Sequence, residues 1–331
     1  MVKKAKKANG KGSTKSKTAQ SVRARNPIVE EVSNPIPVPE PAVHSVSVSD
    51  GSESEGMSAS SQERQPAQPL EMYFDNSQFT KICKIQTKCF VTETVNVIKK
   101  LKPEVNWFTE HPQFHHFFHM PQEPNLKLMG MWMLLLQTIH IEEEDIAWFG
   151  VNGVPIRYSM REHALISGLD CHEYPTRYLK LGSYKFVDAY FKDRARITIK
   201  DVKEKLVGMK PCSDRLQMAV LFFLGRLIRG KAKDSGPLDQ FILRIVDRLD
   251  VCQTFPWGRL TFEDALKGIM HMMDHLKGEP NPTTGFPGFI IPLEILAFEC
   301  IPSLAKEFRE PVPDFHEECP RMCKNRLKRL A

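Results

Sequence analysis

The chain has 331 residues, of which 41% are hydrophobic, and carries a formal net charge of +6. This length is sufficient for a sizeable hydrophobic core. Nine basic residues fall within residues 1–25, which contain no acidic residue, so the rest of the chain holds 37 basic against 40 acidic side chains. The last eleven residues add five basic side chains and no acidic one. Because the excess positive charge lies at the two ends of the chain, a nucleic-acid groove across the folded body is not implied.

The cysteines and the apolar segments predict a soluble, intracellular protein with free thiols. The eight cysteines are scattered and lack the spacing of a disulfide framework. The charged N-terminus is not followed by the apolar segment of a secretory leader. The longest apolar run, residues 216–225, is too short for a membrane-spanning helix, which needs ~20 residues.

Residues 1–70 have the composition of a disordered tail. They contain no aromatic residue, so they cannot bury enough apolar surface to offset the entropy lost on ordering. The tail divides into a basic part, residues 1–25, and an acidic, proline-rich part, residues 26–70. The basic part contains a candidate nuclear-import tract, which consists of Lys3, Lys4, Lys6 and Lys7. Such tracts also occur in nonspecific nucleic-acid contacts and in merely soluble tails.

Order is expected from about residue 71. Apolar residues recur at near-helical spacing from Phe79 to Leu101 and stop before Pro103, which predicts a first helix. A second helix is expected from about Pro124 to Leu136.

A β-hairpin is predicted at about residues 146–158. Asn152-Gly153 between apolar runs is typical of a two-residue hairpin turn, because both central residues must adopt positive φ. The register that follows from this turn pairs Val151 with Val154, Phe149 with Ile156, Ala147 with Tyr158, and Trp148 with Arg157. One face of the hairpin is therefore apolar.

Three sequences fit the pattern that begins a helix with a capping side chain. The first runs from Ser159 to Glu162, and Gly168 suits the left-handed residue that closes the helix. Thr198 begins a second helix, and Thr261 is expected to begin a third.

The remaining periodicities complete a mainly α fold. A helix from Ser213 through Ile228 is apolar nearly all round and should lie at the centre. Further helices are expected from Pro237 and from Pro292. The prediction is a single multi-helix domain at residues 71–310 with one hairpin, preceded by the disordered tail and followed by a short basic tail, residues 311–331.

Two patterns approach known ligand sites but fall short of them. The segment from Gly225 to Ala232 nearly matches the phosphate-binding G-x-x-x-x-G-K-[ST] loop, but alanine has no hydroxyl for magnesium and a helix replaces the required strand. The sequences FHHFFHM (114–120) and HMMDH (271–275) contain histidines four residues apart, without the glutamate of metalloprotease helices.

One further set of residues leaves zinc binding open. His316, Cys319 and Cys323 offer three ligands, whereas a closed structural zinc site needs four. We therefore expect no metal and no other cofactor.

Asp170-Cys171-His172 is the candidate for nucleophilic catalysis. A catalytic cysteine needs a histidine close in space and a local field that lowers the thiol pKa, and adjacency in sequence supplies neither. Cys171 is better explained as a small packing residue after a helix end. We therefore predict no catalytic residues and no enzymatic activity.

Three side chains are candidate partner contacts. Trp257 could stack on a partner, although such a tryptophan more often fills a core beside a turn. Arg157 and Arg259 could contact a partner or the phosphates of DNA.

Four segments together resemble a plant domain of unknown function. They are WFGVNGVPIRYSMREHALISGLDC, the helix ending LIRGK, IVDRLDVCQTFPWGRLTFEDAL and GFIIPLEILAFECIPSL, and the resemblance covers residues 114–308. In that family the domain often precedes a SUMO-protease-like cysteine peptidase in proteins derived from Mutator-type transposons. The hairpin, its following helix and the aromatic-x-W-G segment more distantly resemble the plant mobile domain, a mainly helical family associated with transposons and nuclear gene silencing.

The resemblance does not carry protease activity over to this chain. The peptidase signature contains Asp-Cys-Gly, and here His172 stands where the glycine belongs. What the resemblance implies is a nuclear, transposon-derived module that contacts other macromolecules.

These observations predict a noncatalytic nuclear module that binds protein or chromatin partners and no membrane. One alternative is a DNA-binding protein whose basic ends grip phosphates, which requires binding that weakens steeply with salt. Another is the remnant of a ubiquitin-like-protein protease that lacks its peptidase domain and works through Cys171. The sequence indicates no oligomeric state.

Overall fold

The computed structural model describes residues 71–123, 128–140, 145–231, 233, 235–313, 315 and 317–328. The predicted tail, residues 1–70, and its lysine tract lie outside the described residues, as does His316. The described part of the chain is mainly helical, as predicted. It contains no helix that is both long enough and apolar enough to cross a membrane.

The described residues form thirteen α-helices, several shorter helical turns and six short strands. The α-helices are α1 (Val91–Lys99), α2 (Val105–Thr109), α3 (His116–His119), α4 (Met129–Leu136), α5 (Met160–Ser167), α6 (Lys185–Tyr190), α7 (Ile199–Gly208), α8 (Ser213–Phe223), α9 (Gln240–Ile245), α10 (Leu249–Thr254), α11 (Trp257–Leu276), α12 (Ile291–Cys300) and α13 (Pro302–Phe308). The shorter turns are η1 (Asn76–Gln78), η2 (Tyr178–Lys180), the π-helical η3 (Leu224–Ile228) and η4 (Arg321–Cys323). The strands are β1 (Lys84–Gln86), β2 (Ala147–Val151), β3 (Val154–Tyr158), β4 (Thr283–Gly285), β5 (Arg309–Pro311) and β6 (Asn325–Leu327).

The predicted hairpin and the helix after it are confirmed. Strands β2 and β3 pair in the expected antiparallel register, and the turn residues Asn152 and Gly153 have φ of 51° and 78°. Ser159 and Glu162 form the capping box of α5, and Gly168 ends that helix with φ of 69°. Local sequence therefore decides the path of this segment.

The first predicted helix is shorter than expected. Helix α1 begins at Val91, and the segment from Phe79 to Gln86 is not helical because β1 pairs with β4 in a parallel ladder. This pairing joins segments about 200 residues apart, and such a tertiary contact overrides a local helical preference.

Helix α11 also begins elsewhere than predicted. It starts at Trp257, and Thr261 lies one turn inside it with its hydroxyl donating to the Trp257 carbonyl (2.9 Å). No side chain caps the start of α11. The Asp170 carbonyl accepts a hydrogen bond from the Gly258 amide instead, at 2.7 Å.

The described residues from 317 to 328 pack against the domain, in a region predicted to be a basic tail. Strand β5 pairs with β6, and both Met322 and Cys323 are buried. The Cys323 thiol donates to the carbonyl of His116 (3.3 Å), which fixes this segment against α3. These contacts attach η4 and β6 to the rest of the described domain.

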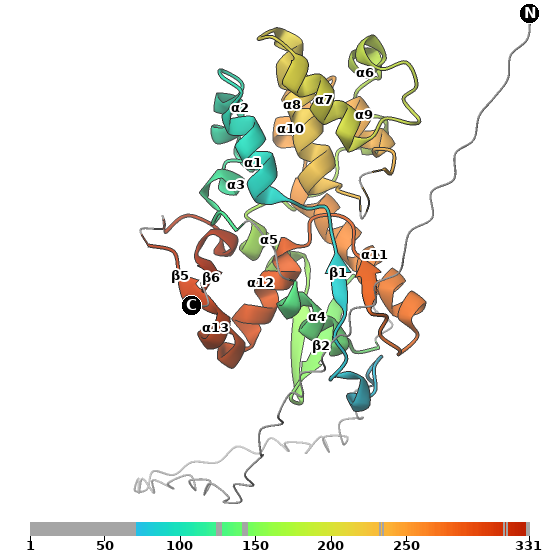
Figure 1. Cartoon of the computed structure of the whole chain (residues 1–331), viewed down its shortest axis with the longest axis vertical. Coiled ribbons are helices and arrows are strands. Elements are labelled where there is room, and N and C mark those ends of the chain that lie inside the picture. The colour runs from blue at the N-terminus through green and yellow to red at the C-terminus, as the bar shows by residue number, and fades with distance from the viewer. Residues whose placement is uncertain are drawn as a thin grey trace, which may run out of the picture. The chain divides into compact units, whose positions relative to one another are not determined.

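The core is centred on α8 and an aromatic cluster. The helix from Ser213 through Ile228 is buried over its second half, as its sequence predicts. The ring of Phe114 lies 4.7 Å from that of Phe223 and 6.0 Å from that of Trp257, measured between centroids. Helices α6 to α10 lie at one end of this part of the chain, and the hairpin lies at the other (Figure 1).

A buried carboxylate joins α4 to α12. Glu294 accepts from the Met131 amide at 2.6 Å and from the Gly130 amide at 3.4 Å, so it satisfies free amides at the amino end of α4. Burial raises the pKa of Glu294 to about 7. The contact fixes the position of α4 in the domain.

Candidate functional site

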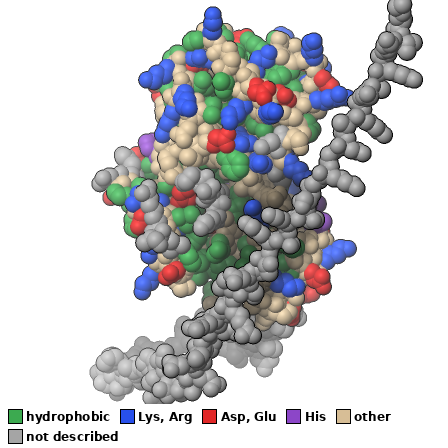
Figure 2. All heavy atoms as spheres, in the orientation of Figure 1, with side chains coloured by type: hydrophobic (Ala, Val, Ile, Leu, Met, Phe, Trp, Pro, Cys, Tyr) green, Lys and Arg blue, Asp and Glu red, His purple; other side chains and the backbone are tan. Residues whose placement is uncertain are grey.

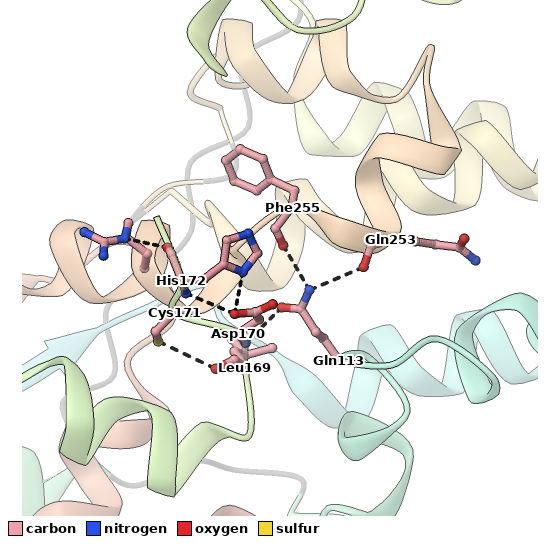
Figure 3. Close-up of polar contacts among 8 residues, drawn as sticks. Gln113, Leu169, Asp170, Cys171, His172, Gln253 and Phe255 are labelled. Atoms are coloured by element: carbon pink, nitrogen blue, oxygen red, sulfur yellow. Dashed lines mark hydrogen bonds and ion pairs between the residues drawn. The ribbon is translucent and has the colours of Figure 1, made fainter. Parts of the chain in front are cut away.

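Two of the segments singled out in the sequence meet in the structure. The turn that follows α5, residues 169–172, lies against the amino end of α11, residues 255–259 (Figure 3). The Asp170 carbonyl accepts from the amides of Gly258 (2.7 Å) and Arg259 (3.3 Å). We call these two segments the junction.

Gly258 allows the two backbones of the junction to approach. A Cβ atom at this position would lie 2.5 Å from Cys171 Sγ and 2.7 Å from the carbonyl oxygens of Leu169 and Asp170. Two of these three atoms belong to the backbone and cannot rotate away. The glycine of the W-G pair is therefore required by packing.

Gln113 holds the junction from a third segment. Its Oε1 accepts from the Asp170 amide (3.1 Å), and its Nε2 donates to the carbonyl of Phe255 (2.9 Å) and, more weakly, to that of Gln253 (3.5 Å). The side chain is buried, and Figure 3 shows it between the two segments. Sequence reasoning missed Gln113, because a single glutamine before an aromatic run carries no motif.

A buried polar chain connects the hairpin, α5 and α11. The Tyr158 hydroxyl lies 2.7 Å from His163 Nδ1, and His163 Nε2 lies 2.8 Å from Thr261 Oγ1. Burial lowers the pKa of His163 to about 3, so the imidazole is neutral near pH 7. Thr261 donates to backbone, so His163 Nε2 donates to Thr261 and Nδ1 accepts from Tyr158.

The Asp170-Cys171-His172 sequence does not assemble a nucleophile with its base. His172 Nδ1 lies 2.7 Å from Asp170 Oδ1, whereas the Cys171 thiol donates to the Leu169 carbonyl at 3.6 Å (Figure 3). Burial and the negative charge of Asp170 together raise the pKa of Cys171 to about 12, against an opposing effect of the Arg259 charge. The thiol is therefore held in its protonated, weakly nucleophilic form.

The three candidate partner contacts have different environments. Trp257 is fully buried, and its Nε1 donates to the Cys252 carbonyl (2.8 Å), so this side chain fills the core. Arg157 is exposed and pairs with Glu162 (3.1 Å). Arg259 is half-buried and donates to the His172 carbonyl (2.6 Å).

The metal candidates are not assembled into a site among the described residues, where no group of three or more potential ligands converges. His115 Nδ1 contacts the His111 carbonyl (2.7 Å), and the rings of His271 and His275 lie 6.3 Å apart. The zinc candidate that includes His316 lies partly outside the described residues. The segment before Gly230 forms η3, so it has no strand and does not fold as a phosphate-binding loop.

We predict that Gly258→Ala destabilises the domain by about 3 kcal/mol, because the added methyl group overpacks the junction. Gly208→Ala is the matched control, since a Cβ there meets no atom within 4 Å. That variant should be neutral or slightly more stable, because alanine favours a helix. Urea unfolding followed by circular dichroism measures both. Equal stability of the two variants would contradict the tight contact at Gly258.

Comparison with known proteins finds a family model that is similar to the part of the chain with most of these features. Residues 135–268 match the model of a Domain of unknown function (DUF1985), a range that contains the hairpin, α5, the junction and most of α11. The chain is 31% identical over 272 residues to an uncharacterized protein of Arabidopsis thaliana. That alignment covers 81% of this chain, and the chain spans 32% of the relative's length. No solved structure matches this chain. Residues 135–268 are thus similar to a domain of unknown function, and the chain is similar to part of a plant protein.

Proposed function

We propose that the protein is a noncatalytic nuclear module that binds protein or chromatin partners and derives from a plant transposon protein. The domain match and the plant relative support the family on which this proposal rests. The observation that carries the interaction role is an exposed apolar surface on α4. The proposed nuclear localisation rests on the lysine tract at residues 3–7.

The exposed apolar surface consists of Ile82, Met129 and Met133, which are 87%, 55% and 41% exposed. We call it the α4 patch. Met129 and Met133 are one helical turn apart, and Trp132 Nε1 donates to the Lys81 carbonyl (3.1 Å), which holds Ile82 near α4. Figure 2 shows hydrophobic side chains gathered in the lower half of this face, where Figure 1 places α4. Adjoining exposed apolar side chains are typical of protein interaction surfaces.

The distribution of charge favours a protein partner over a DNA groove. Lys and Arg side chains are interspersed with Asp and Glu over the face in Figure 2. Several of the arginines are already paired, including Arg157 with Glu162 and Arg321 with Glu299. Binding of DNA by the folded body would require a concentrated basic surface.

We predict that Met129→Gln combined with Met133→Gln reduces partner recovery about tenfold, because glutamine keeps the length and helical preference of methionine but removes its apolar surface. Met270→Gln, at another exposed methionine on α11, is the matched control and should leave recovery unchanged. Affinity purification from plant nuclei with quantitative mass spectrometry measures recovery. Undiminished recovery by the double variant would exclude the α4 patch as the binding surface.

We predict that Cys171 forms no adduct with a ubiquitin-like probe that carries an electrophile at its C-terminus. With its pKa raised to about 12, Cys171 has roughly a thousandfold less thiolate at pH 8 than an ordinary cysteine. Alkylation of exposed Cys212 by iodoacetamide, mapped by mass spectrometry, provides the reference rate. A probe adduct that disappears in Cys171→Ala would establish a thiol hydrolase and remove the noncatalytic proposal.

We predict that residues 1–25 direct a fluorescent reporter to the nucleus, because lysine clusters of this kind are recognised by the import machinery. Replacing Lys3, Lys4, Lys6 and Lys7 by alanine should return the reporter to the cytoplasm. The reporter must be too large to diffuse through nuclear pores, and microscopy gives the ratio of nuclear to cytoplasmic signal. If the fusion with the four lysines intact stays in the cytoplasm, nuclear import by this tract is refuted.

A further inference from the structure

A cleft lined by the α11 residues from Asp264 to His275 has the properties of a ligand site. Its volume is about 430 Å³, which is within the usual size range of small-molecule pockets. Three segments line it, and they are residues 229–231, the α11 face from Asp264 to His275, and residues 284–288. The cleft is independent of the α4 patch and of the interaction role proposed above.

Basic residues are the largest group among the side chains that line the cleft. Five of them are basic, and they are Arg229, Lys231, Lys267, His271 and His275. On α11 the residues 264, 267, 271 and 275 recur at helical spacing, so they project from one face into the same space. The single carboxylate in the lining is that of Asp264.

Arg229 neutralises this carboxylate. Its Nε lies 2.9 Å from Asp264 Oδ2 and its Nη2 lies 3.2 Å from Oδ1, a two-pronged pair that is mostly buried. Arg229 Nη1 also approaches Asp239 Oδ2 at 3.7 Å. Neither Lys231 nor Lys267 forms an ion pair with a carboxylate of the described residues. Among the described residues, the lining therefore keeps two ammonium groups outside any direct ion pair, and the charge of Lys267 also acts on Asp264.

Glycines form part of the cleft wall and fix its edges. Gly288 has φ of 81°, and its amide donates to the Gly230 carbonyl at 2.7 Å, which ties the 284–288 segment to the segment that carries Lys231. A Cβ at Gly268 would lie 2.6 Å from the ring of Phe286, so this glycine lets the 284–288 segment pack on α11. The cationic groups are thus held on a fixed frame.

The charges select against a metal ion and for an anion. His271 and His275 have the spacing of metal ligands, but the nearby carboxylate is held by Arg229 and the lysines would repel a cation. Phosphate suits this arrangement, because lysine ammonium groups bind phosphate oxygens as point charges and histidine can add donors.

We propose that this cleft binds the phosphate groups of a small phosphorylated ligand. Lys231 and Lys267 supply the charge from two sides of the cleft, and His271 and His275 donate hydrogen bonds to phosphate oxygens. Because Arg229 pairs with Asp264, the Asp264 carboxylate is not available to neutralise Lys231 and Lys267.

The test is calorimetric titration of the full chain with inorganic pyrophosphate as the probe. Wild type should bind it saturably, and Lys267→Glu and Lys231→Glu should each weaken binding about tenfold or more through charge repulsion. Lys185→Glu is the matched control, since it makes the same charge change at the exposed first residue of α6, where an acidic residue is favourable. It should change the affinity less than about twofold. Circular dichroism confirms that each variant is folded.

Hydrogen exchange locates the bound probe, with protection expected in residues 264–275 and 284–288. Three results would overturn the proposal. They are the absence of saturable binding to wild type, equal weakening by Lys185→Glu and Lys267→Glu, and equally tight binding of citrate, which would show attraction of any small polyanion without recognition of phosphate.

Discussion

The amino end of α11 is capped by a backbone carbonyl from a distant segment, and the rest of the described domain depends on this contact. The Asp170 carbonyl satisfies the amides of Gly258 and Arg259, and Gly258 leaves room for it. A buried amide without a partner would cost about 1–3 kcal/mol. Because the contact fixes α11 relative to α5, it also fixes the Tyr158–His163–Thr261 chain and the aromatic cluster around Trp257.

The same constraint explains why polar residues with catalytic potential have structural roles at the junction. Cys171 is half-buried beside Gly258 at the start of α11, where desolvation raises its thiol pKa, and His172 binds the side chain of Asp170. His163 is neutral and bonded at both ring nitrogens. Binding functions are therefore better supported by surfaces away from the junction, on α4 and on the outer part of α11.

Several features were predictable because they depend on residues close in sequence. Asn152-Gly153 sets the hairpin register, and Ser159 with Glu162 sets the start of α5. Predictions failed where a distant segment supplied the partner. Thr261 has the sequence of a helix cap, yet Asp170 caps α11 one turn earlier. The segment before α1 pairs with β4, and η4 packs on α3.

The sequence by itself determined the helical class, the hairpin and the placement of excess positive charge in the first 25 residues. Tertiary structure alone decided that Gln113 bridges the junction and that Trp257 is buried. It also decided that Lys231 lines a cleft with Lys267. The physical reason is the distance along the chain over which each interaction acts. The hydrogen bonds of turns and helix caps form between residues close in sequence, whereas burial and the partner of a polar group depend on segments that meet only after folding.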